Sequence, residues 1–141
     1  MTIVARANLQ VIALAALMTS VSSRAEVVVV VSSKSAITAL SKSQVADIFL
    51  GKVSSFPDGI LAVPIDQADG SVERNEFYAR VADRSPAQIT AYWSKIVFTG
   101  RGEPPREVSN DIEMKNRIAA NPSAIGYINA ELVDGSVRVL F

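Results

Sequence analysis

The stretch "ILAVPIDQADGSVERNEFYARV" (residues 60–81) decides the fold. It opens with the apolar run "ILAVPI" (60–65), which has the length and composition of a strand. The turn residues "ADGS" (68–71) follow, and Phe77 and Val81 then stand four residues apart, on one face of a helix. Strand, turn and helix in this order predict an α/β domain.

The flanking sequence supplies further elements of both kinds. Three more stretches have strand character, "EVVVVV" (26–31), "AIGYIN" (124–129) and "SVRVLF" (136–141). Ser41 and Ser85 are each followed three residues later by Gln, the pattern of a capping box, and Asn110 begins a further helix. Gly51 is expected to end the helix that follows Ser41 in a left-handed conformation. The chain therefore predicts a mixed β-sheet flanked by about four helices.

The apolar spacing also predicts which residues face the core. In the helix after Ser85, a buried stripe of Ile89, Trp93, Ile96 and Val97 is expected, with Tyr92 and Phe98 also in the core. In the last helix, Ile112 and Ile118 are expected to be buried. Pro64 cannot donate to a sheet ladder, so it predicts that this strand ends at an edge or at a departure from the sheet. The stretch "GRGEPPRE" (100–107) predicts an exposed loop.

The first 25 residues have the pattern of a signal peptide. "MTIVARANLQVIALAALMTSVSSRA" places a basic residue before the apolar run 9–18 and ends in small residues, so cleavage after Ala25 is expected. The apolar run is shorter than the roughly 20 residues of a membrane span, although a retained N-terminal anchor is the alternative. These features predict export to the periplasm of a single domain, residues 26–141.

Composition excludes several kinds of chemistry. The chain has no cysteine and no histidine, which removes disulfides, thiolate metal sites and Ser-His-Asp catalysis. Beyond residue 25, 14 acidic residues face 12 basic ones, so nothing indicates nucleic-acid binding. We expect no enzymatic activity, no cofactor and no metal. An enzyme would depend on the turn carboxylates alone, and nothing in their context demands that role.

The start of the helix after residue 71 is a natural place to hold an anion, because helix N-termini present unpaired N–H groups and partial positive charge. This one is acidic, with four carboxylates against the single cation Arg74: Asp66, Asp69, Glu73 and Glu76. Their spacing does not match a calcium loop. The sequence favours a solvated acidic helix start.

Three stretches together resemble one protein family. "IFLGKVSSF" (48–56), "ADGSVERNEF" (68–77) and "AIGYI" (124–128) are similar to the "IFxGKxxxW", "SDGSGTTxxF" and "GAIGY" motifs of the phosphate-binding periplasmic subunits of ABC importers. The resemblance implies a type 2 periplasmic-binding-protein-like fold. Such proteins hold their ligand between two lobes, and this chain resembles the second lobe only.

The resemblance also implies a degenerate anion site, with candidate ligand-binding residues Gln67, Asp69, Gly70 and Ser71 and with phosphate or another small anion as ligand. The family's arginine falls on Gln67, its second glycine on Val72 and its first threonine on Glu73. A lost cation and an added carboxylate both disfavour an oxyanion. We therefore expect that the isolated chain does not bind phosphate as the importers do.

Two functions remain open. In the first, the domain serves phosphate uptake or sensing, and a protein partner or a second copy completes the site; Lys34, Arg101 and Arg106 are the cations that the chain itself could supply. In the alternative, the domain has lost solute binding and acts as a periplasmic interaction or sensor-accessory module. The loop "TGRGEPPRE" (99–107) would then be a contact surface.

Overall fold

The computed structural model describes residues 26–141, which form a five-stranded sheet in the order β3-β2-β4-β1-β5. The strands are β1 (Val27–Ser32), β2 (Val63–Gln67), β3 (Arg106–Val108), β4 (Ala124–Asn129) and β5 (Val137–Val139). β1 is antiparallel to β4 and β5, whereas β2 is parallel to both β3 and β4. The sheet is mixed, which confirms the predicted α/β class.

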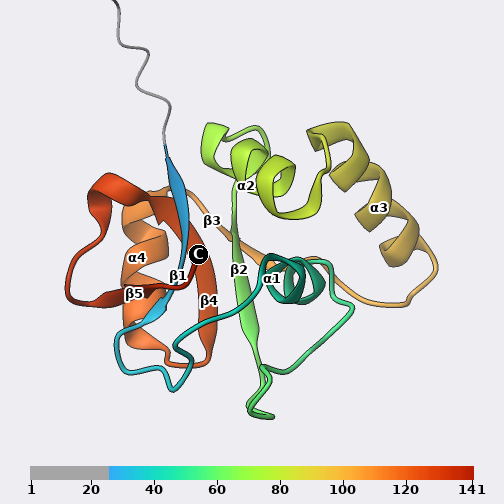
Figure 1. Cartoon of the computed structure of the whole chain (residues 1–141). Helices are drawn as coiled ribbons and strands as arrows, with labels where there is room; N and C mark the ends of the chain where they lie inside the picture. The colour runs from blue at the N-terminus through green and yellow to red at the C-terminus, as the bar shows by residue number, and fades with distance from the viewer. Residues whose placement is uncertain (1–25) are drawn as a thin grey trace, which may run out of the picture.

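Four α-helices and a short 3₁₀ turn, η1 (Ala130–Leu132), complete the described chain. The helices are α1 (Lys42–Phe49), α2 (Val72–Ala82), α3 (Pro86–Phe98) and α4 (Asp111–Ala120). The helices cover both faces of the sheet, with an apolar cluster on each face. α1, α2 and α3 pack on one face and α4 packs on the other. In Figure 1, α4 lies on the left and α2 and α3 lie on the right.

The alternation of side chains along β4 separates the two clusters. Ile125 and Tyr127 face α1 to α3, and Tyr127 stacks on Phe77 of α2 with ring centroids 4.1 Å apart. On the opposite face, a Cβ atom added to Gly126 would lie 2.5 Å from Sδ of Met114 in α4. The absence of a side chain at position 126 thus lets α4 approach the sheet closely.

The structure confirms the predicted helix caps and the predicted buried face of α2. Ser41 and Ser85 both form the reciprocal hydrogen bonds of a capping box. Gly51 ends α1 with a left-handed φ of +70°. Phe77 and Val81 are both buried, as their spacing predicts.

The strand predicted at 60–65 is displaced toward the C-terminus. Ile60 and Leu61 are exposed, and Leu61 forms only an isolated bridge with Ser55. The strand continues instead through Asp66 and Gln67, both 2% exposed. A strand can include these polar residues because other parts of the fold satisfy their hydrogen bonds.

β3 was not predicted from the sequence, because it begins inside the segment 100–107 that was expected to be a loop. This three-residue strand follows Pro105 and pairs with β2 from Ile65 to Gln67. It is too short and too polar to show a strand pattern, and only Val108 is buried. Pro64 pairs with β4 on one side. On its other side it has no partner within the described chain, because pairing with β3 begins only at Ile65. Pro64 therefore has one open edge, as predicted.

Three residues predicted to be buried are exposed instead. Val97, Phe98 and Ile112 are 53%, 92% and 62% exposed, whereas Ile89 and Trp93 are buried as expected. Val97 and Phe98 stand in the last turn of α3, and Ile112 in the first turn of α4. A helical stripe is thus buried only along the part of the helix that packs on the rest of the fold. Met114 and Ile118 fill the core under α4.

The predicted signal peptide lies outside the described residues. Within residues 26–141, no helix is long and apolar enough to cross a membrane.

Candidate functional site

The candidate site lies where the parallel strands β2 and β3 end, at one edge of the sheet. β2 continues through residues 68–71 into α2, and β3 leads into α4. Ser71 caps α2 by accepting a hydrogen bond from Arg74 N (3.2 Å), and Asn110 caps α4 by accepting one from Glu113 N (2.9 Å). Two helix N-termini therefore begin at the same edge, one on each face of the sheet.

The turn at residues 68–71 presents backbone donors to the outside. Gly70 has a φ of +84°, a conformation that L side chains rarely adopt, and Ser71 N donates to Ala68 O at 3.1 Å. Within residues 26–141, the N–H groups of Val72 and Glu73 meet no acceptor. They are the unpaired donors that the start of an α-helix offers to an anion.

The structure brings Asp69, Gly70 and Ser71 together in this turn but directs the side chain of Gln67 elsewhere. Gln67 Nε2 donates to Asp111 Oδ1 at 2.5 Å and to the backbone oxygen of Tyr127 at 3.2 Å. The amide group is buried and connects β2 to the first residue of α4. It therefore fixes the end of β2 relative to the start of α4 and to β4.

Asp66, which we expected in a solvated acidic turn, is instead the centre of a buried polar cluster. Its Oδ2 accepts a hydrogen bond from the Tyr78 hydroxyl at 2.5 Å, and its Oδ1 accepts from the Tyr127 hydroxyl and from Gln67 N. These donors come from α2, β4 and β2. We call Asp66, Gln67, Arg74, Tyr78 and Tyr127 the Asp66 cluster.

Arg74 belongs to the same cluster and is only 8% exposed. Its Nη1 donates to Glu107 Oε1 at 2.7 Å and to Gln67 O at 3.3 Å, and its Nε lies 3.9 Å from Asp66 Oδ2. The guanidinium is therefore committed to protein carboxylates. Its burial could have been found in the sequence, since Arg74 shares a helical face with Phe77, Tyr78 and Val81.

Burial shifts the protonation equilibria of this cluster. Removal from water raises the pKa of Asp66 above its ordinary value, and this effect outweighs the opposing hydrogen bonds from Tyr127 and Tyr78 and the charge of Arg74. Burial also raises the pKa of both tyrosines, and the neighbouring Asp66 charge adds to the rise. The two hydroxyls therefore stay protonated and act as donors.

The three cations that could complete an anion site are not gathered at the turn. Lys34 follows β1, whose end pairs with the beginning of β4, so it stands at the opposite end of the sheet. Arg101 lines a hollow beside the end of α1, and Arg106 begins β3. Across the described chain, none of the three makes a hydrogen bond or ion pair with residues 68–71. Residues 26–141 also contain no group of three or more potential metal ligands.

Comparison with known proteins finds similar folds among solved structures. No protein-family model matches the sequence, and a comparison with curated proteins finds no match either. Among solved structures, a protein described as a phosphate ABC transporter substrate-binding protein of Clostridium perfringens, with bound phosphate, superposes with a TM-score of 0.65 at 20% identity. The alignment covers 81% of this chain and 43% of that one.

Two further structures give the same result. An ABC-type phosphate transport receptor of Vibrio cholerae matches with a TM-score of 0.64 at 19% identity, covering 81% of this chain and 44% of that one. PstS of Borrelia burgdorferi matches with a TM-score of 0.56 at 12% identity, covering 81% and 46%. The chain has the fold of one part of these phosphate-transport proteins. It spans less than half of their length.

Proposed function

We propose that this domain is one half of an anion-binding cleft and serves phosphate uptake or sensing together with a second component. The observation that carries the proposal is the pair of unpaired N–H groups of Val72 and Glu73, at the end of β2 in a fold similar to phosphate-transport proteins. The turn 68–71 and the first turn of α2 would contribute the backbone donors. Gly70 and Ser71 would allow a ligand to approach them closely.

The charges at the turn indicate why a second component is needed. Asp69 is exposed and Glu73 is half-buried at the start of α2, while the nearby cation Arg74 is already paired with Glu107. A like charge about 4 Å away costs an anion roughly 1 kcal/mol in water and about 4 near a protein surface. The cations that offset this cost would come from a partner or from another copy of the chain.

The proposal includes export to the periplasm and no catalysis. Export is supported by the signal-peptide pattern of residues 1–25. A binding role is supported by the similarity to substrate-binding proteins. The absence of catalysis is supported by the buried acid Asp66, whose carboxyl is hydrogen-bonded to two tyrosine hydroxyls and whose side chain is only 2% exposed.

Thermal unfolding with phosphate, and with sulfate at matched ionic strength, tests the site. Glu73→Gln removes the unfavourable carboxylate, whereas Glu76→Gln makes the same charge change one turn later on α2. We expect phosphate to raise the unfolding midpoint of Glu73→Gln by more than it raises that of the wild type or of Glu76→Gln. At ten times the dissociation constant, a ligand stabilises by about 1.4 kcal/mol, or roughly 5 °C. Equal behaviour of all three proteins would contradict the proposed site.

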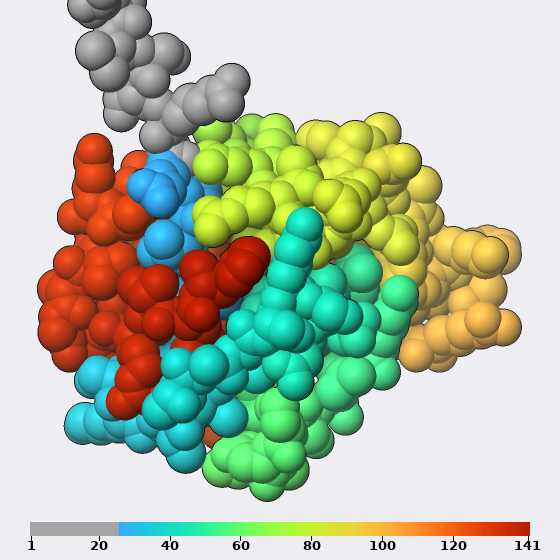
Figure 2. Space-filling view, in the orientation of Figure 1, coloured from blue at the N-terminus to red at the C-terminus, as the bar shows by residue number. Residues whose placement is uncertain are grey.

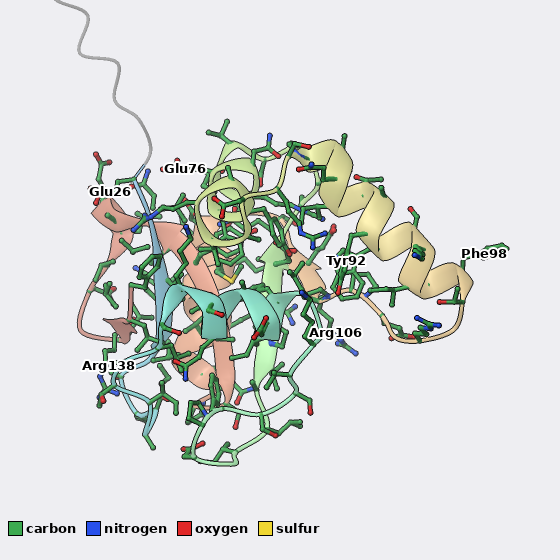
Figure 3. All side chains as sticks on the ribbon, turned by 45° about the vertical axis from the view of Figure 1, so that its right-hand side comes forward. Glu26, Glu76, Tyr92, Phe98, Arg106 and Arg138 are labelled. Carbon is green, nitrogen blue, oxygen red and sulfur yellow. The ribbon has the colours of Figure 1, made fainter. Side chains whose placement is uncertain are left out.

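The second candidate function is a protein-interaction module, and the exposure of Phe98 favours it. The ring is 92% exposed at the end of α3, and Figure 3 shows it pointing away from the body of the protein. Figure 2 shows the segment that follows, around residues 99–105, projecting from the same side. A protruding aromatic ring with Arg101 nearby in sequence is the composition typical of a contact hot spot.

A photo-crosslinking amino acid at position 98 tests this second function in cells that produce the protein. The same amino acid at position 139 is the matched control, since Val139 is also an exposed apolar residue. We expect one discrete cross-linked product that depends on position 98 and disappears when Arg101 is replaced by Gln. Identical products from positions 98 and 139, or none, would contradict it.

A further inference from the structure

We propose a second binding site, on the α4 side of β2 and β3, for a small organic carboxylate with a short apolar body. The site is a groove of about 370 Å³ between α4 and the sheet edge. Its lining includes three apolar side chains, two arginines and an amide: Val63, Ile65, Val108, Arg106, Arg117 and Asn121. Apolar walls with a few convergent polar groups are typical of small-molecule sites, whose volumes start near 300 Å³.

Strand alternation explains why these side chains share one face. Val63 and Ile65 of β2 point to the α4 face, and so do Arg106 and Val108 of β3, whose partners in the register are Ile65 and Gln67. Glu107, between them, points to the other face and pairs with Arg74. The alternation along β3 therefore directs the Arg106 guanidinium into the groove and the Glu107 carboxylate to the opposite face of the sheet.

The two arginines give the groove its preference for a carboxylate. The side chain of Arg106 forms no hydrogen bond or ion pair within the described chain. Arg117, across the groove on α4, already contacts one carboxylate, with Nη2 3.4 Å from Glu113 Oε1, and its side chain remains 54% exposed. A guanidinium matches a carboxylate with two parallel hydrogen bonds. The ligand's apolar body would lie on Val63, Ile65 and Val108.

The end of α4 opposes an anion here, but more weakly than the arginines attract it. The partial negative charge at a helix C-terminus is a weak effect at a surface, where solvent screens it. A hydrogen bond between a guanidinium and a carboxylate is stronger, and two guanidinium groups line the groove. The balance favours an anion, and the apolar floor selects an organic one over inorganic phosphate.

This groove is separate from the turn at residues 68–71. The groove lies beside Arg117 and Asn121, at the C-terminal end of α4, whereas the turn lies at the edge where α4 begins, at Asp111. The two sites adjoin at one backbone hydrogen bond, from Ala68 N to Val108 O at 3.1 Å, but share no lining side chain. The amide signals of Ile65, Val108 and Asn121 report on the groove, and those of Val72 and Glu73 report on the turn.

Nuclear magnetic resonance titration of the purified protein with phenylacetate tests the proposal. Acetate supplies the carboxylate without the apolar body, and 2-phenylethanol supplies the body without the charge. We expect phenylacetate to shift the signals of Ile65, Val108 and Asn121 at millimolar concentration, and both fragments to bind at least tenfold more weakly. Arg106→Gln should weaken phenylacetate binding about ten- to hundredfold, the loss expected for a charge-assisted hydrogen bond.

Arg101→Gln is the matched control, because it removes the same charge from an exposed position on the preceding loop. It should leave phenylacetate binding unchanged. The proposal is overturned by equal weakening from Arg101→Gln, which would indicate non-specific attraction, or by acetate binding as tightly as phenylacetate. The proposal is also overturned if the amide signals of the groove residues do not move at any millimolar concentration of phenylacetate.

Discussion

The Asp66 cluster and the turn 68–71 are neighbours in sequence, but the charged side chains of the cluster are buried and paired, whereas that of Asp69 in the turn is exposed. In the cluster, Asp66 receives hydrogen bonds from two tyrosine hydroxyls, and Arg74 lies between Asp66 and Glu107. In the turn, Asp69 is exposed and forms no ion pair within residues 26–141. A charged residue in the cluster supports the fold, whereas one in the turn is available to a ligand or partner.

The largest expected effect is the loss of the carboxylate at the centre of the cluster. Asp66→Ala leaves the hydroxyls of Tyr78 and Tyr127 without their acceptor and removes a partner of Arg74, so it should lower the free energy of unfolding by about 3–5 kcal/mol. Asp69→Ala in the turn should change it by less than about 0.5 kcal/mol. Urea unfolding of both variants measures the difference. Similar losses would show that the two regions are not distinct.

The contrast between buried and exposed positions extends to the other face of the sheet. Gly126→Ala would place a Cβ atom 2.5 Å from Met114 Sδ and 3.0 Å from Ile118 Cδ1. Such overpacking should cost about 1–3 kcal/mol. Gly135→Ala meets open space and is the matched control, with an expected effect near zero. Unfolding midpoints in urea decide the comparison, and an unaffected Gly126→Ala would mean that α4 packs less closely on β4.

The caps of the two neighbouring helices should contribute less. Ser71→Ala and Asn110→Ala each remove a side-chain acceptor at a helix start and should cost about 1 kcal/mol in the free energy of unfolding. Because Ser71 also stands in the turn, only Ser71→Ala should alter the response of the protein to phosphate. Chemical unfolding with and without phosphate separates the two roles. An altered phosphate response in Asn110→Ala would assign the site to the start of α4 instead.

The smallest effect is the pH dependence that one buried acid introduces. The folded-state pKa of Asp66 is raised above its ordinary value of 3.8, so the stability that this group contributes is fully present below that pH. It is lost as the pH rises through the folded-state pKa. The free energy of unfolding of the wild type, relative to that of Asp66→Asn, should therefore fall with rising pH above 3.8. A relative stability that rises with pH would contradict the direction of this shift.

Local signals in the sequence predicted much of the fold. The capping boxes at Ser41 and Ser85 and the left-handed Gly51 depend on neighbouring residues only, and each appears in the structure as expected. β3 could not be predicted, because its three residues form a strand only through pairing with β2. Phe98 and Ile112 were expected in the core because periodicity does not tell where along a helix packing stops.

The candidate site was predictable only in part, for a similar reason. The turn 68–71 was predicted from the sequence and is present, whereas the cap that Ser71 provides for α2 was not predicted. The burial of Asp66 depends on Tyr127, sixty-one residues away, and the direction of the Gln67 side chain depends on Asp111. Long-range hydrogen bonds therefore decided which polar residues belong to the interior, and sequence spacing carries little information about them.

The most direct test of the half-cleft is a nuclear magnetic resonance titration of the purified protein with phosphate, because it observes the Val72 and Glu73 amides themselves. Sulfate at matched ionic strength is the control. We predict that phosphate moves both signals with a dissociation constant in the millimolar range, more tightly in Glu73→Gln than in the wild type, and that sulfate moves them less. If neither signal responds in either protein, or if sulfate acts as phosphate does, the turn after β2 is not half of a phosphate cleft.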